Sequence, residues 1–126
     1  MIVLDTHALV WWSSEPMRLS ARARRAIDAE KRLGVPAIVF WETALLVRKR
    51  RLDLGMPTGE WAERVLAIPR VEPLDMTPEI ALEADALIMH ADPADRFIVA
   101  TALRLEAPVL TKDRLLRDLR WVKTMW

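Results

Sequence analysis

The first five residues constrain the fold of this chain more than any other segment. Ile2, Val3 and Leu4 form a short run that is apolar without alternation, and the run ends abruptly at Asp5. A run without a polar face is typical of a strand buried on both sides, as in a parallel sheet covered by helices. The start of the chain therefore predicts a central parallel strand with a carboxylate at its carboxyl end.

Further short apolar runs alternate with segments of helical spacing. We expect additional strands around Val35, over residues 70–74 and 108–110, and at the sheet edge over residues 121–122. Helices are expected over residues 6–13, 20–32, 37–51, 59–68, 77–89 and 92–105, with a short one after Asp113. This alternation predicts an α/β fold: a three-layer α/β/α sandwich with a mostly parallel central sheet, in a single domain over residues 1–126.

Several helix ends carry local signals. Ser20, Thr77 and Asp92 are residue types that cap helix N-termini, and the last two are followed by proline, which suits the first helical position. Gly34 stands where a glycine commonly ends a helix. We therefore expect Gly34 to close the helix that begins at Ser20.

Composition narrows the classes of function. The 126 residues include no cysteine, which excludes a disulfide framework and a thiolate metal site. The start of the chain lacks the basic residues and the apolar run of a secretory signal. The longest uncharged stretch, residues 6–14, is much shorter than the roughly 20 residues of a membrane span. We therefore expect a soluble, cytoplasmic protein with no membrane association.

The net charge of +1 does not by itself indicate a nucleic-acid partner. Basic residues nevertheless gather in two predicted helices, between Arg22 and Arg32 and between Arg48 and Arg51. A solvated helix face explains such runs in most proteins. If several acids are collected in one site, however, the remaining surface is net basic, which suits a nuclease.

Four acidic residues are expected near the carboxyl ends of the strands, where open parallel sheets bind ligands. Asp5 and Asp113 follow predicted strands, and each could simply cap the next helix. Glu42 lies in an otherwise apolar helix, where an arginine partner would satisfy it. Asp95 lies in the first turn of a helix, where an acid favours the helix dipole. Each acid alone is therefore open to a structural explanation.

Taken together, these carboxylates indicate a divalent-metal site. Acids that converge in one pocket repel one another and are costly to bury, and a divalent cation relieves both costs. Mg²⁺, with Mn²⁺ as a substitute, prefers oxygen ligands, and the sequence has no cluster of His or Cys for zinc. The chemistry that follows is metal-assisted hydrolysis of a phosphodiester bond.

Four short motifs also follow one another along the chain. They are Asp5-Thr6-His7-Ala8-Leu9-Val10-Trp11-Trp12, Trp41-Glu42, His90-Ala91-Asp92-Pro93-Ala94-Asp95-Arg96 and Thr111-Lys112-Asp113. In type and order they resemble the motifs of PIN-domain ribonucleases, specifically the VapC toxins of type II bacterial toxin–antitoxin systems. The resemblance extends from Ile2 to about Trp121. Related chains usually carry a serine where this chain has Val39, a change that removes no metal ligand.

The resemblance implies a PIN fold and a metal-dependent endoribonuclease that is the toxin of a toxin–antitoxin pair. It implies that four carboxylates act in catalysis and metal binding, with Asp5 and Asp95 as the main ligands. Glu42 and Asp113 would support them directly or through water. It also implies an RNA substrate, a cognate antitoxin protein and assembly into a homodimer.

The motifs contain further polar residues with smaller implied roles. Thr6 and Thr111 are candidates for orienting carboxylates or ordered waters around the metal. Arg96 is a candidate contact for RNA or for a protein partner. Asp92 is expected to cap a helix. Both histidines are interpreted as structural, because a metal-bound water needs no imidazole to become a nucleophile.

Two other functions compete with a ribonuclease. The first is a non-catalytic PIN-like module that binds RNA or an antitoxin, which the modest net charge favours. The intact set of four acids argues against it, since a scaffold has no need of mutually repelling carboxylates. The second is a phosphoacceptor receiver domain, which shares the parallel α/β architecture. That domain would need a paired-acid opening, and Asp5 has no adjacent acid.

Overall fold

The computed structural model describes residues 1–126 and contains five strands and seven α-helices. The strands are β1 (Ile2–Leu4), β2 (Leu33–Pro36), β3 (Val71–Leu74), β4 (Val109–Leu110) and β5 (Thr124–Met125). The helices are α1 (Thr6–Ser14), α2 (Ala21–Ala29), α3 (Ala37–Arg48), α4 (Thr58–Leu66), α5 (Pro78–Ala86), α6 (Pro93–Arg104) and α7 (Arg114–Arg117), with a short 3₁₀ helix η1 (Pro16–Arg18). The predicted alternation of strands and helices is confirmed.

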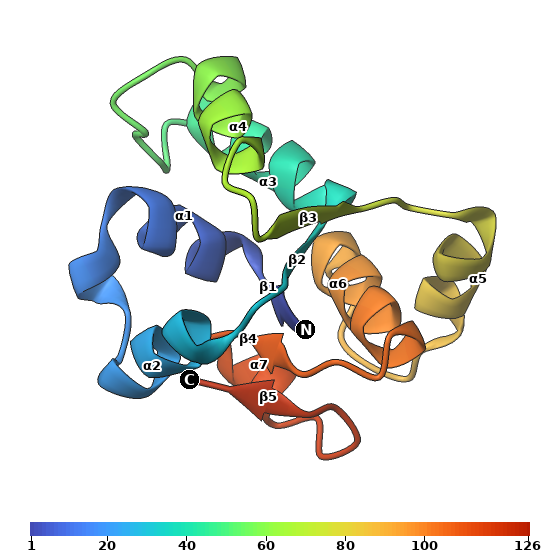
Figure 1. Ribbon diagram of the computed structural model, residues 1–126. Coiled ribbons are helices and arrows are strands. Elements are labelled where there is room, and N and C mark those ends of the chain that lie inside the picture. Colours follow the sequence, from blue (N-terminus) through green and yellow to red (C-terminus); the bar gives the residue numbers. More distant parts are fainter.

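The sheet is parallel throughout, in the order β3-β2-β1-β4-β5. Strand β1 is central, and Val3 lies beside Gly34 of β2 on one side and Val109 of β4 on the other. Helices α1 and α2 lie on one side of the sheet and α5 and α6 on the other (Figure 1). This arrangement confirms the predicted three-layer α/β/α fold and the burial of the first strand.

Gly34 does not end a helix, contrary to the prediction. Helix α2 ends at Ala29 with Glu30 as its C-cap, and Gly34 lies within β2. A Cβ atom at Gly34 would lie 2.8 Å from Leu74 Cδ1 and 3.0 Å from Met1 Sδ. The glycine is therefore explained by close side-chain packing across the strand, a long-range constraint that its local position does not reveal.

Three other predicted boundaries are wrong. Helix α3 ends at Arg48, three residues before the expected Arg51. The edge strand expected over residues 121–122 is a turn, and the strand forms instead at Thr124–Met125, where the chain pairs with β4. Helix α5 ends at Ala86, three residues before the expected Met89. The chain leaves the helix there because backbone carbonyls of this segment accept hydrogen bonds from Arg96.

The predicted helix caps are confirmed in atomic detail. Ser20 Oγ accepts a hydrogen bond from Ala23 N at 3.0 Å, and Thr77 Oγ1 accepts one from Ile80 N at 3.2 Å. Such caps satisfy backbone donors that have no partner inside the helix. The starts of α2 and α5 were therefore readable from local sequence.

The hydrophobic core surrounds the central strand on both faces of the sheet. It contains all three residues of β1 together with buried side chains of α1, α3 and α6. Val39 is fully buried in this core, so its side chain serves packing. None of the helices is both long and apolar enough to cross a membrane. The core holds α1, α3 and α6 against the sheet edge where the acidic residues gather.

Candidate active site

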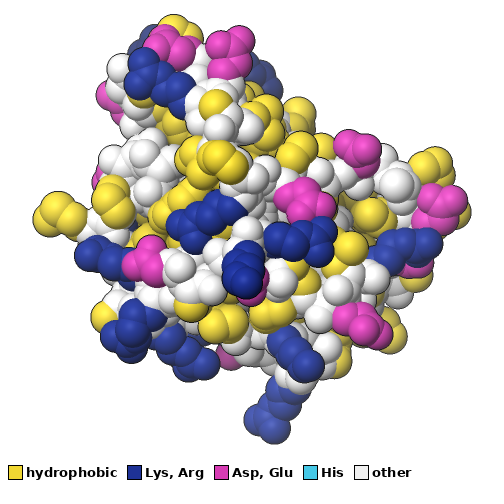
Figure 2. All heavy atoms as spheres, in the orientation of Figure 1, with side chains coloured by type: hydrophobic (Ala, Val, Ile, Leu, Met, Phe, Trp, Pro, Cys, Tyr) yellow, Lys and Arg dark blue, Asp and Glu magenta, His cyan; other side chains and the backbone are white.

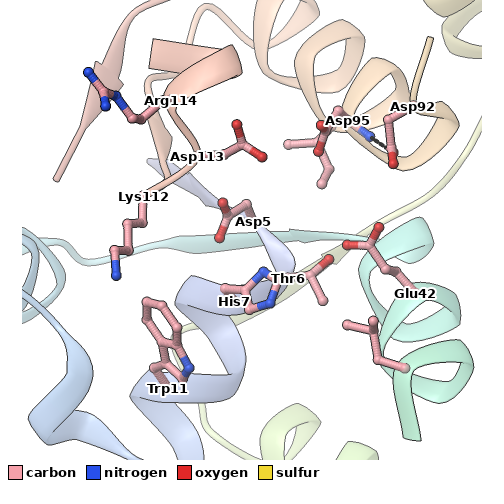
Figure 3. Close-up of a pocket in the computed structure, with 12 residues that line it drawn as sticks. Asp5, Thr6, His7, Trp11, Glu42, Asp92, Asp95, Lys112, Asp113 and Arg114 are labelled. Atoms are coloured by element: carbon pink, nitrogen blue, oxygen red, sulfur yellow. Dashed lines mark hydrogen bonds between the residues drawn. The ribbon is translucent and has the colours of Figure 1, made fainter. Parts of the chain in front are cut away.

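A pocket of about 480 Å³ opens at the carboxyl ends of β1 and β4. These neighbouring strands mark the point where the strand order reverses, because the chain continues from β1 to β2 on one side and from β4 to β5 on the other. Open parallel sheets bind ligands at such points. The four acids that the sequence singles out all line this pocket: Asp5, Glu42, Asp95 and Asp113 (Figure 3).

Asp5 lies at the centre of the pocket because it directly follows β1. Its Oδ1 accepts a hydrogen bond from Ala8 N at 2.7 Å, so Asp5 also caps helix α1. The residue is 6% exposed. The helix-cap explanation of Asp5 is therefore correct, but it accounts for only one of the two carboxylate oxygens in a buried, pocket-lining side chain.

Asp95 lies in the first turn of α6, where Asp92 is the N-cap. The Asp95 backbone N–H donates to Asp92 Oδ1 at 3.1 Å, and its side-chain Oδ2 lies 2.6 Å from His90 Nε2. Asp92 also lines the pocket, beside Asp95 (Figure 3). The helix start thus brings two carboxylates to one wall of the pocket.

Glu42 and Asp113 reach the pocket from different elements. Glu42 projects from α3 and makes no hydrogen bond or ion pair, so the arginine partner that would explain it structurally is absent. Asp113 is the N-cap of α7, and its Oδ1 accepts from Leu115 N at 2.7 Å. Its own N–H donates to Thr111 Oγ1 at 3.0 Å.

The pocket raises the pKa of two carboxyls. Burial raises the pKa of Asp5 to about 7, and the negative charges of Asp95 and Glu42 add to the rise, while hydrogen bonds from Thr111 and Ala8 oppose it. Burial likewise raises the pKa of Asp95 to about 6, opposed by the hydrogen bond with His90. Shifts in this direction mean that negative charge is insufficiently compensated in the pocket.

Two cations line the pocket but pair with none of its acids. Lys112 and Arg114 flank Asp113 in the sequence and lie on the wall opposite Glu42 (Figure 3). The Lys112 ammonium lies 5.3 Å from the centre of the Trp11 ring, a cation–π contact that holds it at the rim. Sequence reasoning missed these cations as site residues, although their positions beside Asp113 were a usable signal.

The donor chemistry of the pocket fits a hard divalent cation. Its acidic side chains are oxygen donors, which Mg²⁺ and Mn²⁺ prefer. The Oγ1 atom of Thr6 is buried in the same pocket and has no hydrogen-bond partner. No three His, Cys, Asp or Glu side chains are arranged to ligate one ion as they stand. Binding would therefore require the carboxylates to converge, which their mutual repulsion opposes without a cation.

Arg96 is not brought to the pocket, although it directly follows Asp95. Its guanidinium donates to backbone carbonyls of the segment that joins α5 to α6. Of the two histidines, His7 lines the pocket and His90 contacts Asp95. Thr111 is fully buried beside the pocket through its contact with Asp113.

Comparison with known proteins relates this chain to one family. Residues 2–122 match the PIN domain family. The chain is 39% identical over 129 aligned residues to Ribonuclease VapC22 of Mycobacterium tuberculosis, and the alignment covers 99% of this chain and 98% of that protein. The alignment therefore extends over the sheet, the surrounding helices and the positions of the four pocket acids.

Solved structures have the same fold. The VapBC2 complex of Rickettsia felis, bound to a promoter DNA fragment, has a chain that superposes with a TM-score of 0.72 at 15% identity, covering 98% of this chain and 97% of that one. VapC20 of Mycobacterium tuberculosis, described as a toxin that cleaves the sarcin–ricin loop, gives 0.72 at 15% identity, with 98% of each chain covered. At this identity the likeness establishes the fold alone.

Proposed function

The chain belongs to the PIN domain family, within it to the VapC proteins, and from that premise we propose that it is a metal-dependent endoribonuclease acting as a toxin. Hydrolysis of RNA phosphodiester bonds would take place in the pocket at the ends of β1 and β4. The observation that carries the proposal is the set of four carboxylates in that pocket, none of which is paired with a lysine or arginine.

The carboxylates would divide the work of binding the metal. Asp5 and Asp95 would be the main ligands, because the pocket raises the pKa values of these two acids. A bound cation would return both carboxyls to the ionised form. Glu42 and Asp113 would support them directly or through water. When bound, Mg²⁺ or Mn²⁺ would activate a water molecule and stabilise the leaving oxygen.

The remaining pocket residues would position the substrate and the ligands. Lys112 and Arg114 supply positive charge for the phosphate backbone, which an acidic pocket would otherwise repel. The buried Thr6 hydroxyl has a free hydrogen-bonding capacity that a carboxylate or an ordered water could satisfy. Thr111 would hold the loop that carries Asp113, through its bond to the Asp113 N–H.

The proposed toxin needs a partner that restrains it. Similar folds occur in the VapBC2 complex of Rickettsia felis and in a toxin–antitoxin complex from Klebsiella pneumoniae, which superposes with a TM-score of 0.67 at 15% identity. We propose a cognate antitoxin and a homodimer for this chain as well. We also propose that the chain acts in the cytoplasm, where an RNA substrate would be available.

The decisive test is RNA cleavage by the purified, antitoxin-free chain. Total RNA would be incubated with Mg²⁺ or Mn²⁺, with and without EDTA, beside the Asp5→Asn and Asp28→Asn variants. Asp28 is an exposed acid of α2 whose side chain makes no hydrogen bond or ion pair, and it serves as the matched control. We expect discrete fragments from the wild-type chain and from Asp28→Asn, none from Asp5→Asn, and none in EDTA. Equal cleavage by Asp5→Asn would refute the proposed site.

A non-catalytic module that binds RNA or an antitoxin is the second candidate. It is favoured by the observation that no three acidic side chains are arranged to hold one ion. This module would bind RNA with equal affinity in the presence of Mg²⁺ and of EDTA, and would release no fragments. The same incubation, followed by a gel-shift measurement on the intact RNA, distinguishes the two functions.

A further inference from the structure

The guanidinium of Arg96 is enclosed by the segment that joins α5 to α6. It donates five hydrogen bonds, all to backbone carbonyls, at 2.9 to 3.2 Å. The acceptors are the carbonyl oxygens of Ala84, Asp85, Leu87, Met89 and His90. The first two belong to the end of α5, where helix carbonyls have no partner within the helix. Arg96 therefore fixes the path of the chain from α5 to His90.

The side chain of His90 is fixed in turn against Asp95. Its Nε2 lies 2.6 Å from Asp95 Oδ2, a hydrogen bond in which the ionised carboxylate accepts. Both side chains are largely buried, with 21% and 17% exposure. Asp95 lines the pocket and His90 does not, so their contact joins the pocket wall to the residues outside it. The other oxygen of Asp95, Oδ1, has no hydrogen-bond partner in the protein.

The contacts of Arg96 and of Asp95 with His90 together fix the segment between residues 90 and 96. Arg96 Nε donates to the backbone carbonyl of His90, while the His90 ring holds the side chain of Asp95, the residue next to Arg96. The Asp95 backbone is held independently by the Asp92 cap. Backbone and side chain of Asp95 are thus fixed at separate points, whereas Glu42 has no such support. Ordinary helix capping accounts for the contact with Asp92 but not for those of His90 and Arg96.

We propose that His90 is a positioning residue that holds Oδ2 of Asp95 and leaves Oδ1 for the metal, and that Arg96 holds His90 in place. This inference rests on the proposed function. Metal-ligating side chains are commonly oriented by a second hydrogen bond on the side away from the metal, and loss of such a partner weakens metal binding about 10–100-fold. Arg96 then acts through the backbone and through His90, without touching RNA.

The test is Mn²⁺ binding by isothermal titration calorimetry, on RNA-free protein. His90→Leu removes the donor, and we expect Mn²⁺ affinity to fall by about 10–100-fold. His90→Gln keeps an N–H donor at a similar reach, and we expect affinity within a few-fold of the wild-type value. Ile88→Ala, at a 92% exposed position of the same segment, is the matched control and should bind as the wild-type chain does. Equal affinity of His90→Leu and the wild-type chain would overturn the inference.

Cleavage kinetics separate positioning from loss of folded protein. For His90→Leu we expect kcat to fall at limiting Mn²⁺ and to recover at saturating Mn²⁺, with the KM for RNA unchanged. A fall of the same size at every Mn²⁺ concentration would mean loss of active protein and would contradict the inference. Thermal unfolding in EDTA measures the folded fraction of each variant directly.

The role of Arg96 is tested by Arg96→Lys. Lysine keeps the positive charge, but its single nitrogen cannot reach five carbonyls spread over the end of α5 and the segment that follows it. We expect Arg96→Lys to lower both the unfolding temperature in EDTA and the Mn²⁺ affinity. Wild-type Mn²⁺ affinity in Arg96→Lys would show that charge suffices and would overturn the role assigned to Arg96.

Measurements on the wild-type chain distinguish a failure of this inference from a failure of the proposed function. If it binds Mn²⁺ but cleaves no RNA, the proposed function fails, and the His90 comparison still stands or falls on Mn²⁺ affinity. If it cleaves RNA while His90→Leu binds Mn²⁺ equally well, only the present inference fails. A wild-type chain that binds no Mn²⁺ overturns both.

Discussion

The carboxylates on the outer surface and those in the pocket have opposite electrostatic environments. On the surface, Glu72 accepts two hydrogen bonds from Arg32, both at 2.8 Å, and Glu60 accepts one from Arg64 at 2.7 Å. The hydrogen bond with Arg32 holds the pKa of Glu72 below its usual value. In the pocket, burial raises the pKa of Asp5 to about 7. One group is stabilised as an anion by the folded chain, and the other is destabilised as an anion.

This difference is not due to a shortage of cations. The chain has 19 lysines and arginines against 18 acids. On the face shown in Figure 2, acidic and basic side chains lie side by side over α4 and α5, while basic ones predominate around α2. Lys112 and Arg114 line the pocket itself and still pair with no acid. The pocket therefore keeps negative charge free for a ligand, at a cost in stability that is typical of functional sites.

The strongest test of this comparison is Asp5→Asn, which should change activity and stability in opposite directions. We expect RNA cleavage to fall to background. In EDTA at pH 8, the free energy of unfolding should rise by up to a few kcal/mol, because the buried charge is removed while asparagine retains the helix cap. Urea denaturation and the cleavage assay measure the two effects. A destabilised Asp5→Asn protein would contradict the view that Asp5 is strained as an anion.

The pH dependence of stability should also show the raised pKa values of the pocket carboxyls. Asp5 and Asp95 have pKa values of about 7 and 6 in the folded chain, against a reference value of 3.8. The folded state therefore holds these protons more tightly than the unfolded state. Stability from these groups is fully present below about pH 4 and is lost as pH rises through about 6 and 7.

Urea denaturation in EDTA between pH 4 and 8 measures this loss. Surface acids such as Glu72 act in the opposite direction and at lower pH, because their pKa values are depressed. We expect the Asp5→Asn variant to lose less stability across the upper part of the range. A wild-type free energy of unfolding that rises between pH 5 and 7 would count against the raised pKa values.

A bound divalent cation should stabilise the pocket carboxylates as anions, as arginines already stabilise the surface carboxylates. At pH 7, Mn²⁺ at about 100 times its dissociation constant should stabilise the wild-type chain by about 2.7 kcal/mol. Asp5→Asn should show little of this stabilisation, and Glu72→Gln should show all of it. Thermal unfolding with and without Mn²⁺ makes the comparison. An equal shift in all three proteins would place the cation outside the pocket.

Replacement of Lys112 should affect substrate binding more than the chemical step. Because Lys112 lies at the rim and contacts Trp11 and no acid, Lys112→Gln should raise the KM for RNA several-fold with little change in kcat. Loss of one phosphate contact should also reduce the salt dependence of RNA binding by about one unit of slope. Unchanged salt dependence would exclude Lys112 from the RNA-binding surface.

The smallest effect on stability and activity is expected at the exposed ion pair of Arg32 and Glu72. Glu72→Gln removes an exposed partner of Arg32, and exposed ion pairs contribute little because solvent screens them. The unfolding midpoint and the rate of RNA cleavage should both equal the wild-type values. A large loss of stability in this variant would remove the distinction between surface and pocket carboxylates.

The sequence by itself determined the order of strands and helices and the four acids that meet in the pocket, but not the two cations that line it. Local signals suffice for these features: an unbroken apolar run predicts β1, and a capping residue followed by helical spacing predicts α2, α5 and α6. Asp5 directly follows one parallel strand, and Asp113 closely follows another. Because the carboxyl ends of parallel strands lie at one edge of the sheet, the predicted sheet already brought these two acids together.

Away from the helix caps, only the tertiary structure decided which partners the polar groups have. Glu42 lacks an arginine, Arg96 donates to backbone carbonyls of the segment before it, and Gly34 serves side-chain packing in β2 instead of ending a helix. These outcomes depend on residues that are distant in the sequence or on the exact path of a turn. Residue type and spacing set what a side chain can bind, whereas packing of the whole chain sets which partner comes within reach.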